Sequence, residues 1–244
     1  MAGWLTLRKG LYCALRPRLW HALRTGVAPS IEHLEALRFV RPRTVVDVGA
    51  NRGQFTLLAR ALFPDANVFA FEPLSAPGEV FRRLFSGDTA VRLFNVAIGS
   101  STASAQMNVM TRDDSSSLLP PGELQSDIFG TDQSTTQTIS VQRLADALER
   151  SSLIRPAIMK IDVQGFELEV LRGSSDLLAL FDAILVECSF VELYKGQPLA
   201  REVISFLAEK GFTLRGVFNQ HVDDARGPIQ ADFMFENVMG TEVP

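Results

Sequence analysis

The segment VVDVGANRGQF, residues 45–55, combines features that suit a ligand-binding turn. An apolar run contains a carboxylate near its end, Asp47, and Gly49 and Gly53 follow with Asn51 between them. Such a run predicts a buried strand that ends in a sharp turn, which is where open parallel sheets bind their ligands. A glycine at position 49 allows a positive φ angle and a close approach of the ligand to the backbone.

The same turn restricts the class of ligand. Dinucleotide-binding turns read G-x-G-x-x-G, and here Asn51 occupies the place of the middle glycine, which leaves room for the pyrophosphate. The G-K-[ST] of a P-loop is absent. The carboxylate of Asp47 would repel a diphosphate and suits a ligand with positive charge. We therefore expect S-adenosylmethionine as the ligand, with Asp47 and Gly49 beside it and with Asn51 and backbone N–H groups near the helix start meeting its carboxylate. Gly53 opens the following helix.

Two further strand ends extend the expected cofactor site. Glu72 follows the run NVFAF and lies 23 residues after Gly49. That spacing is close to the one expected for an acid that accepts hydrogen bonds from ribose hydroxyls. The alternative for Glu72 is a surface charge. The third run ends in FNVAIG, so Asn95 to Ala97 are expected to line the adenine side, with ordinary strand-end packing as the alternative.

Later acids and one histidine are the candidates for catalysis. Asp162 ends AIMKID and Glu187 lies near the end of AILVEC, so both carboxylates face one cleft if their strands neighbour the first strand. The alternative is a structural ion pair, with Lys160 for example, because burying a lone carboxylate costs on the order of several kcal/mol. His221, in FNQHVDD, is either a general base for a hydroxyl or an exposed loop histidine. The two acids could hold a divalent cation, but no third acidic ligand is evident, so no metal site is predicted.

A sheet is needed to bring these strand ends together. Short β-rich runs alternate with helical stretches, which predicts an α/β fold with a mostly parallel sheet and helices on both faces. Only the polar segment NQHVDDARGPIQ joins the last two strands, so we expect them to form an antiparallel pair. The expected strands are residues 44–48, 67–71, 91–98, 157–162, 183–188, 212–218 and 231–237, and the expected helices are residues 53–63, 76–85, 165–173 and 202–211.

Residues 99–140 interrupt this alternation and are rich in Ser, Thr, Asp and Gly. SAQMNVM and TTQTISV are expected to be short strands, and the segment between them is too long for a plain connection. We expect this region to be a lid or insertion over the site, and the alternative is a simply mobile loop.

The order VVDVGANRGQF, FAFEP, NVAIG and KIDVQGFELEVLRG resembles the FkbM family of S-adenosylmethionine-dependent methyltransferases, over about residues 44–237. The resemblance implies a Rossmann-like class I methyltransferase fold, with a seven-stranded sheet in a domain that spans residues 44–244. It also implies methylation of a hydroxyl group, often on a sugar, a glycolipid or a polyketide-type product. The competing hypotheses are a non-catalytic S-adenosylmethionine-binding module and a nucleotide-dependent oxidoreductase, which Asp47 and Asn51 disfavour.

The resemblance also implies roles for single residues. Asp162 would lie where the cofactor and the acceptor meet, and the serine-rich stretch DDSSSLL, residues 113–119, is similar to a family loop near the cofactor. The family motif K-I-D-V-E-G has an acid where this chain has Gln164, which makes Gln164 a poor proton acceptor. Asp47, Gly49, Asn51, Gly53 and Glu72 would hold the cofactor.

Composition and charge limit the remaining possibilities. Cys13 and Cys188 form no disulfide framework, which favours a reducing, cytoplasmic compartment. Residues 1–43 carry eight Arg or Lys and two Glu, a net charge of +6, so residues 44–244 carry −10 of the total of −4. An acidic main domain argues against nucleic acid as a partner and leaves a small-molecule or glycan acceptor. The basic N-terminal helical extension, residues 1–43, either lies on an anionic membrane or packs on the domain.

Overall fold

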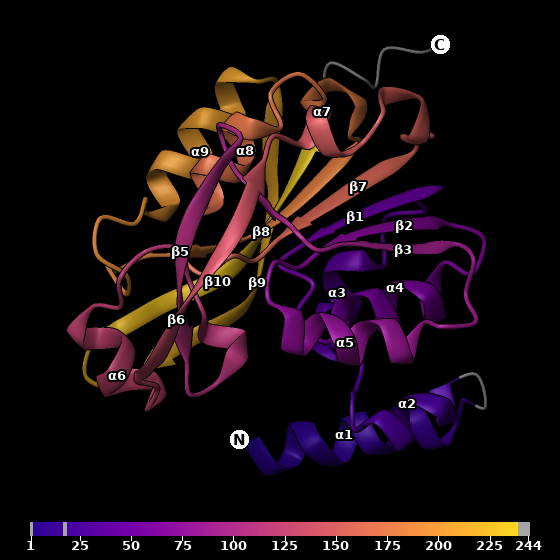
Figure 1. Cartoon of the computed structure of the whole chain (residues 1–244), viewed down its shortest axis with the longest axis horizontal. Helices are drawn as coiled ribbons and strands as arrows, with labels where there is room; N and C mark the ends of the chain where they lie inside the picture. The colour runs from indigo at the N-terminus through magenta and orange to yellow at the C-terminus, as the bar shows by residue number, and fades with distance from the viewer. Residues whose placement is uncertain (1, 17–18, 239–244) are drawn as a thin grey trace.

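A seven-stranded sheet forms the centre of the molecule (Figure 1). The computed structural model describes residues 2–16 and 19–238. Residues 1 and 17–18 of the expected extension and residues 239–244 of the expected domain lie outside the described residues. In spatial order the strands are β3 (Val91–Phe94), β2 (Asn67–Phe71), β1 (Thr44–Val48), β7 (Ala157–Ile161), β8 (Ala183–Ser189), β10 (Gly227–Asn237) and β9 (Phe212–Asp223). The strands from β3 to β8 pair in parallel, and β10 runs antiparallel to both of its neighbours. The predicted mostly parallel sheet with its antiparallel pair is confirmed.

Helices cover both faces of this sheet (Figure 1). Successive strand side chains point to opposite faces, so Val45 packs in the core beneath the helices of one face and Val46 in the core of the other. On the first face lie α3 (Leu34–Leu37), α4 (Gln54–Leu62) and α5 (Ser75–Leu84), and on the second lie α7 (Leu144–Ala147), α8 (Glu167–Gly173) and α9 (Ala200–Glu209). Short 3₁₀ helices are η2 (Ile31–His33), η3 (Asp113–Ser115), η4 (Arg150–Ser152) and η5 (Leu178–Leu180).

The N-terminal extension packs on the main domain. Its helices α1 (Ala2–Ala14) and α2 (Trp20–Thr25) form a further layer beside α5 (Figure 1). Cys13, Leu19 and Ala22 are buried against Leu57 and Phe81 of the domain. Within the described residues, no helix combines the length and apolar character needed to cross a membrane.

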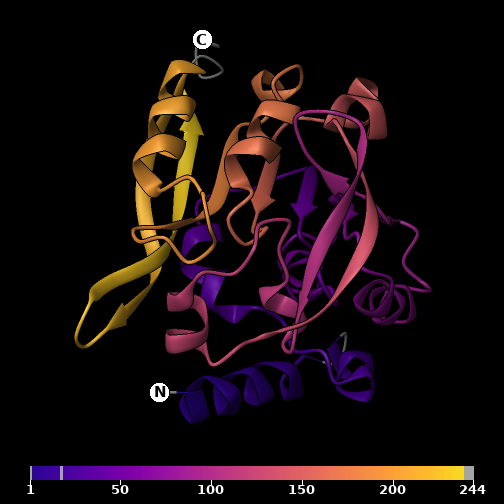
Figure 2. The same ribbon diagram turned by 60° about the vertical axis from the view of Figure 1, so that its left-hand side comes forward.

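Residues 99–140 form most of a second, three-stranded sheet. It contains β4 (Ala97–Ile98), β6 (Gln133–Gln142) and β5 (Ala103–Met110), in that order, and Figure 2 shows the long β5–β6 ribbon beside the central sheet. The two predicted short strands are confirmed and pair with each other. The segment between them holds η3 and α6 (Glu123–Phe129).

Among the predicted element boundaries that are wrong, the ends of one strand and one helix have clear local reasons. The expected strand 91–98 is divided between the two sheets, because the Asn95 side chain donates hydrogen bonds to the carbonyl oxygens of Glu72 and Pro73 and the chain turns there. The expected helix 165–173 begins only at residue 167, because Gln164 and Gly165 both adopt positive φ angles, 56° and 97°.

The polar segment NQHVDDARGPIQ is mostly strand, not a loop. It continues β9 and β10 into a long hairpin, in which His221 pairs with Gln230 and residues 224–226 make the turn. β9 lies at the edge of the sheet and is largely exposed, so polar side chains fit there without burial.

Close packing of α8 on the second sheet generates a test of the fold. A Cβ atom on Gly173 would lie 1.9 Å from the carbonyl oxygen of Gly99, a backbone atom that cannot rotate away. We predict that Gly173→Ala lowers the free energy of unfolding by about 2 kcal/mol or more, measured by urea denaturation. The matched control is Gly87→Ala, where a Cβ atom has no neighbour within 4 Å. Equal stability of the two variants would show that α8 packs less tightly than described.

Candidate active site

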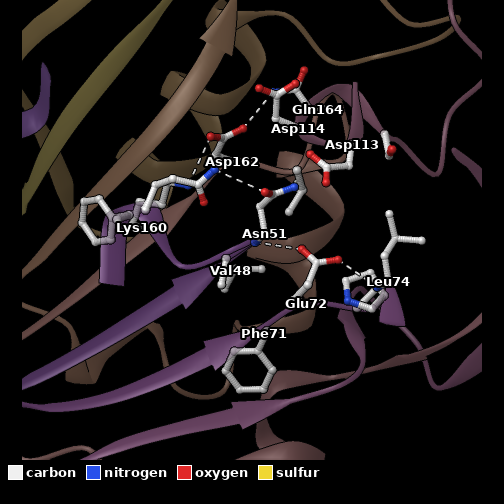
Figure 3. A pocket seen from close by; sticks show the side chains of 18 of the residues that line it. Val48, Asn51, Phe71, Glu72, Leu74, Asp113, Asp114, Lys160, Asp162 and Gln164 are labelled. Atoms are coloured by element: carbon white, nitrogen blue, oxygen red, sulfur yellow. Dashed lines mark hydrogen bonds and ion pairs between the residues drawn. The ribbon is translucent and has the colours of Figure 1, made fainter. Parts of the chain in front are cut away.

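A pocket of about 250 Å³ opens at the C-terminal ends of β1, β2 and β7, where the sequence predicts a site (Figure 3). The second sheet and the N-terminal extension contribute to its walls. Five predicted site residues line it, namely Gly49, Asn51, Glu72, Ala97 and Asp162. The other five do not line it, namely Asp47, Gly53, Asn95, Glu187 and His221.

Glu72 is held by backbone groups on both sides of its carboxylate. Its Oε2 accepts the N–H of Asn51 at 2.9 Å and its Oε1 accepts the N–H of Leu74 at 2.8 Å, as the dashed lines in Figure 3 show. Burial raises the pKa of Glu72 to about 7, against the lowering effect of these two hydrogen bonds. Each carboxylate oxygen keeps a lone pair for a further donor. The residue is thus a fixed acceptor whose charge changes near neutral pH.

The glycine turn brings two strand ends into backbone contact. Gly49 has a φ angle of 79°, and a Cβ atom there would lie 1.9 Å from the carbonyl oxygen of Asp162. Asn51 also has a positive φ angle, 45°, and its Oδ1 accepts the backbone N–H of Arg52 at 2.7 Å. The ends of β1 and β7 therefore meet without a side chain between them, which leaves the pocket open to a ligand.

A buried lysine holds together the acids of β1 and β7. The Nζ atom of Lys160 lies 3.1 Å from Oδ2 of Asp162 and 3.9 Å from Oδ1 of Asp47. Burial alone would lower the pKa of Lys160, but the two carboxylates outweigh it and raise the pKa. Burial would raise the pKa of Asp162, but the ammonium of Lys160 and a hydrogen bond from Gln164 lower it. Asp162 is thus a charged carboxylate at the pocket wall.

Asp47 does not contact the pocket, which corrects the expectation that it selects the charge of the cofactor. Its side chain has no exposed surface, and its Oδ2 accepts a hydrogen bond from the Thr56 hydroxyl at 2.7 Å. Burial raises its pKa, although Lys160 acts in the opposite direction. Asp47 therefore belongs to the charge balance inside the sheet.

Gly53 and Asn95 support the site from behind the pocket wall. Gly53 precedes α4 with a φ angle of 96°, and a Cβ atom there would lie 2.6 Å from the Phe85 ring. Its role is helix packing, not cofactor contact. Asn95 does not line the pocket. Its Nδ2 donates hydrogen bonds to the carbonyl oxygens of Glu72 and Pro73, at 2.7 and 3.0 Å. Asn95 therefore positions the backbone of Glu72, whereas Ala97 lines the pocket itself.

Gln164 connects the two acids that were expected to face one cleft. Its Nε2 donates to Oδ1 of Asp162 and to Oε2 of Glu187, both at 2.8 Å, and the Tyr194 hydroxyl lies 3.0 Å from its Oε1. Glu187 does not line the pocket and is joined to it by the Gln164 amide, which corrects the expectation of a direct role. Burial and then the charge of Asp162 raise the pKa of Glu187 well above its usual range. The departure from the acidic family motif at position 164 was the sequence signal for this residue.

The pocket histidine is His33, not His221. His221 is exposed on β9, and its ring packs against Phe129 with centroids 5.0 Å apart. His33 lines the pocket, with Nε2 3.1 Å from Oδ2 of Asp232 and Nδ1 3.2 Å from the carbonyl oxygen of Ser30. Burial would lower its pKa, but the hydrogen bond with Asp232 raises it. With an acceptor beside each ring nitrogen, His33 is held in one orientation and its protonated form is favoured. No sequence motif predicts this residue.

The serine-rich stretch, residues 113–119, forms part of the pocket wall. Asp113, Asp114, Ser116 and Leu118 line the pocket, and Arg52 forms an ion pair with Asp113 at 2.7 Å. This pair ties the second sheet to the glycine turn. In the part of the chain that the structure describes, no group of three or more His, Cys, Asp or Glu side chains is arranged to hold a metal ion.

Sequence comparison identifies the family. The profile of the methyltransferase FkbM domain matches residues 47–214, which is more than half of the chain and contains most of the central sheet. The chain belongs to the FkbM methyltransferase family. The observed strand order agrees with the class I methyltransferase fold that the resemblance implied. The FkbM segment excludes the extension, most of β9 and all of β10, so His33 and Asp232 both lie outside it.

Individual relatives of this FkbM methyltransferase are distant. Methyltransferase 1 of Beauveria bassiana is 30% identical over 59% of this chain, and the match spans 63% of that protein, less than two thirds of its length. The 2-O-methyltransferase NoeI of Sinorhizobium fredii is 26% identical over 82% of this chain and 88% of its own. The solved precorrin-6y C5,15-methyltransferase of Geobacter metallireducens is 13% identical, with a TM-score of 0.45 and coverage of 83% and 84%.

The buried lysine generates a stability prediction. Lys160→Met leaves Asp47 and Asp162 without their cation, so we expect a loss of about 3 kcal/mol in the free energy of unfolding at pH 8. Without the lysine the folded-state pKa values of both acids rise, so stability falls as the pH increases and the loss is smaller at pH 5. Urea denaturation at both pH values measures this. The exposed Lys195→Met is the control, with an expected change within about 0.5 kcal/mol. A loss that is independent of pH would contradict the assignment.

The raised pKa of Glu72 generates a binding prediction. Below its pKa of about 7 the carboxyl is protonated, so a ligand whose hydroxyls donate to the carboxylate binds less well. We predict that the affinity for S-adenosylhomocysteine, measured by calorimetry, falls up to tenfold per pH unit below about 7. Glu72→Gln should weaken binding at pH 8 at least tenfold and remove this pH dependence. An unchanged pH profile in the variant would remove Glu72 from the ligand site.

Proposed function

We propose that this chain transfers a methyl group from S-adenosylmethionine to a hydroxyl oxygen of a sugar, a glycolipid or a secondary metabolite. The observation that carries the proposal is a single pocket with two differently held acids. Glu72 is anchored by backbone N–H groups, and Asp162 is kept charged by Lys160. The first suits a ribose, and the second suits the place where a cationic donor and a hydroxyl meet.

The pocket residues fit the donor part by part. The carboxylate of Glu72 has free lone pairs for two ribose hydroxyls. Leu74, Ala97, Ile98 and Phe166 supply an apolar wall for a flat heterocycle next to it. Gly49 removes the side chain that would otherwise separate the ligand from the ends of β1 and β7. Once bound, the donor would supply an electrophilic methyl group on a positively charged sulfur.

The remaining residues have to position the acceptor and receive its proton. Asp162 is held by Lys160 at 3.1 Å and by Gln164 at 2.8 Å, so its orientation is fixed. Fixing an acceptor hydroxyl in line with the methyl group can contribute up to about 7–11 kcal/mol in favourable cases. The proton needs to leave only late in such a transfer, so a carboxylate with a lowered pKa is an adequate acceptor. Both ring nitrogens of His33 already contact acceptors, Asp232 and the Ser30 carbonyl oxygen, so His33 is a less suitable proton acceptor than Asp162.

The relatives support a hydroxyl acceptor. NoeI is named a 2-O-methyltransferase and covers most of this chain. The polar side of the pocket agrees with such an acceptor, because Ser30 places a buried hydroxyl there that has no hydrogen-bond partner among the described residues. The rival functions are a non-catalytic S-adenosylmethionine-binding module and a nucleotide-dependent oxidoreductase, and ligand binding and label transfer separate them.

We predict that the purified chain binds S-adenosylhomocysteine and not NAD in calorimetry. We also expect it to transfer a labelled methyl group to members of a panel of sugars, glycolipids and hydroxylated metabolites. Mass spectrometry and NMR of the product should place the label on oxygen. Asp162→Asn should lower the transfer rate at least a hundredfold and the S-adenosylhomocysteine affinity by less than tenfold, because the donor keeps Glu72. NAD binding alone, or label on nitrogen or carbon, would overturn the proposal, and binding without transfer would favour the non-catalytic module.

A further inference from the structure

The outer face of the N-terminal extension carries a cluster of exposed apolar side chains. Leu11, Leu15 and Trp20 have exposed fractions of 59%, 70% and 56%. Leu11 and Leu15 are one helical turn apart, and the Leu15 N–H donates to the Leu11 carbonyl. The Trp20 indole donates to the carbonyl oxygen of Ala14 at 3.1 Å, which places the start of α2 against the end of α1. Single exposed apolar residues are common, but a cluster on neighbouring helices marks a binding surface. We call Leu11, Leu15 and Trp20 the apolar stripe.

Two arginines flank the apolar stripe, Arg8 on α1 and Arg24 on α2. Arg8 lies three residues before Leu11, and Arg24 lies four residues after Trp20, so each shares a helix face with a stripe residue. Both are exposed, and neither side chain has a hydrogen bond or ion pair to another residue that the structure describes. Their charges are therefore available to an anionic partner. Residues 1–43 carry a net charge of +6 and the rest of the chain carries −10. An anionic partner is therefore attracted to the extension and repelled by the rest of the chain.

A cavity beside α2 adds an independent observation. It has a volume of about 650 Å³ and lies between α2 and the ends of α4 and α5. Leu19, Leu57 and Phe85 supply apolar walls, while Arg24 and Arg83 lie at its edge with exposed side chains. Arg60, which also lines it, is already paired with Asp88 at 2.7 Å. Neither guanidinium group has a hydrogen-bond or ion-pair partner among the described residues, so Arg24 and Arg83 add exposed positive charge beside α2.

We propose that the outer face of the extension binds the surface of an anionic phospholipid bilayer, with the apolar stripe at the headgroup level and Arg8 and Arg24 on lipid phosphates. Interfacial helices combine Trp and Leu on one face with flanking basic residues, as α1 and α2 do. A second copy of this chain is a less suitable partner. Its acidic domain would attract Arg8 and Arg24, but the apolar stripe also needs an apolar surface. The inner face of the same helices stays on the domain through Cys13, Leu19 and Ala22, so binding requires no unfolding. The proposal goes beyond the methyl transfer and does not depend on it.

Vesicle sedimentation tests the proposal with the full chain. The chain should sediment with vesicles of equal parts phosphatidylglycerol and phosphatidylcholine, and not with pure phosphatidylcholine vesicles or in 0.5 M salt. The triple variant Leu11→Ser, Leu15→Ser, Trp20→Ser should bind at least tenfold more weakly. Phe39→Ser is the matched control, since this side chain is 76% exposed and lies beyond α3, off these two helices. Deleting the extension is a poorer test, because its inner face belongs to the core.

A second variant keeps the test decisive if the triple variant folds poorly. Arg8→Glu with Arg24→Glu leaves the apolar stripe intact and should also weaken binding at least tenfold, with an unchanged thermal midpoint. The proposal is overturned if the unmodified chain ignores anionic vesicles, if it binds neutral vesicles equally, or if Phe39→Ser weakens binding as much as the triple variant. It is also overturned if the unmodified chain is a dimer that the triple variant converts to a monomer, because the stripe is then an interface between copies.

Discussion

The pocket depends on one buried cation. Lys160 faces Asp47 across the β1–β7 register and Asp162 two residues further along its own chain. The Phe55 ring lies beside the ammonium group, with its centroid 5.6 Å from Nζ of Lys160. A buried ammonium is stable only with carboxylates around it, and the lysine in turn keeps Asp162 charged at the pocket wall. The lysine that balances the buried charge of Asp47 therefore also keeps Asp162 charged at the pocket wall.

Backbone groups, more than side chains, give the rest of the pocket its shape. Two N–H groups orient Glu72, and Gly49 lets the ends of β1 and β7 meet. The positive φ angles of Gln164 and Gly165 delay the start of α8 and turn the Gln164 amide toward both acids.

The sequence was a good guide to strand ends and a poor guide to side-chain direction. Strands and their turns depend on local patterns, so Gly49, Asn51, Glu72 and Asp162 could be placed at one edge of the sheet. Asp47 could not be assigned from the same pattern. Successive residues of a strand point to opposite faces, and the lysine that neutralises Asp47 comes from a strand more than a hundred residues away. The pairing of β9 with β10 was predicted, but its continuation through the polar segment 219–230 was missed, because polar residues at an exposed edge look like a loop.

The ion pair between His33 and Asp232, 3.1 Å apart, joins an early segment of the chain to one that is made very late. During synthesis, the wall of the pocket that contains His33 has no anionic partner until β10 has left the ribosome. β10 also has to enter between β8 and β9 before the sheet is complete. A chain that ends with the FkbM segment, residues 47–214, therefore lacks both β10 and the carboxylate that pairs with His33.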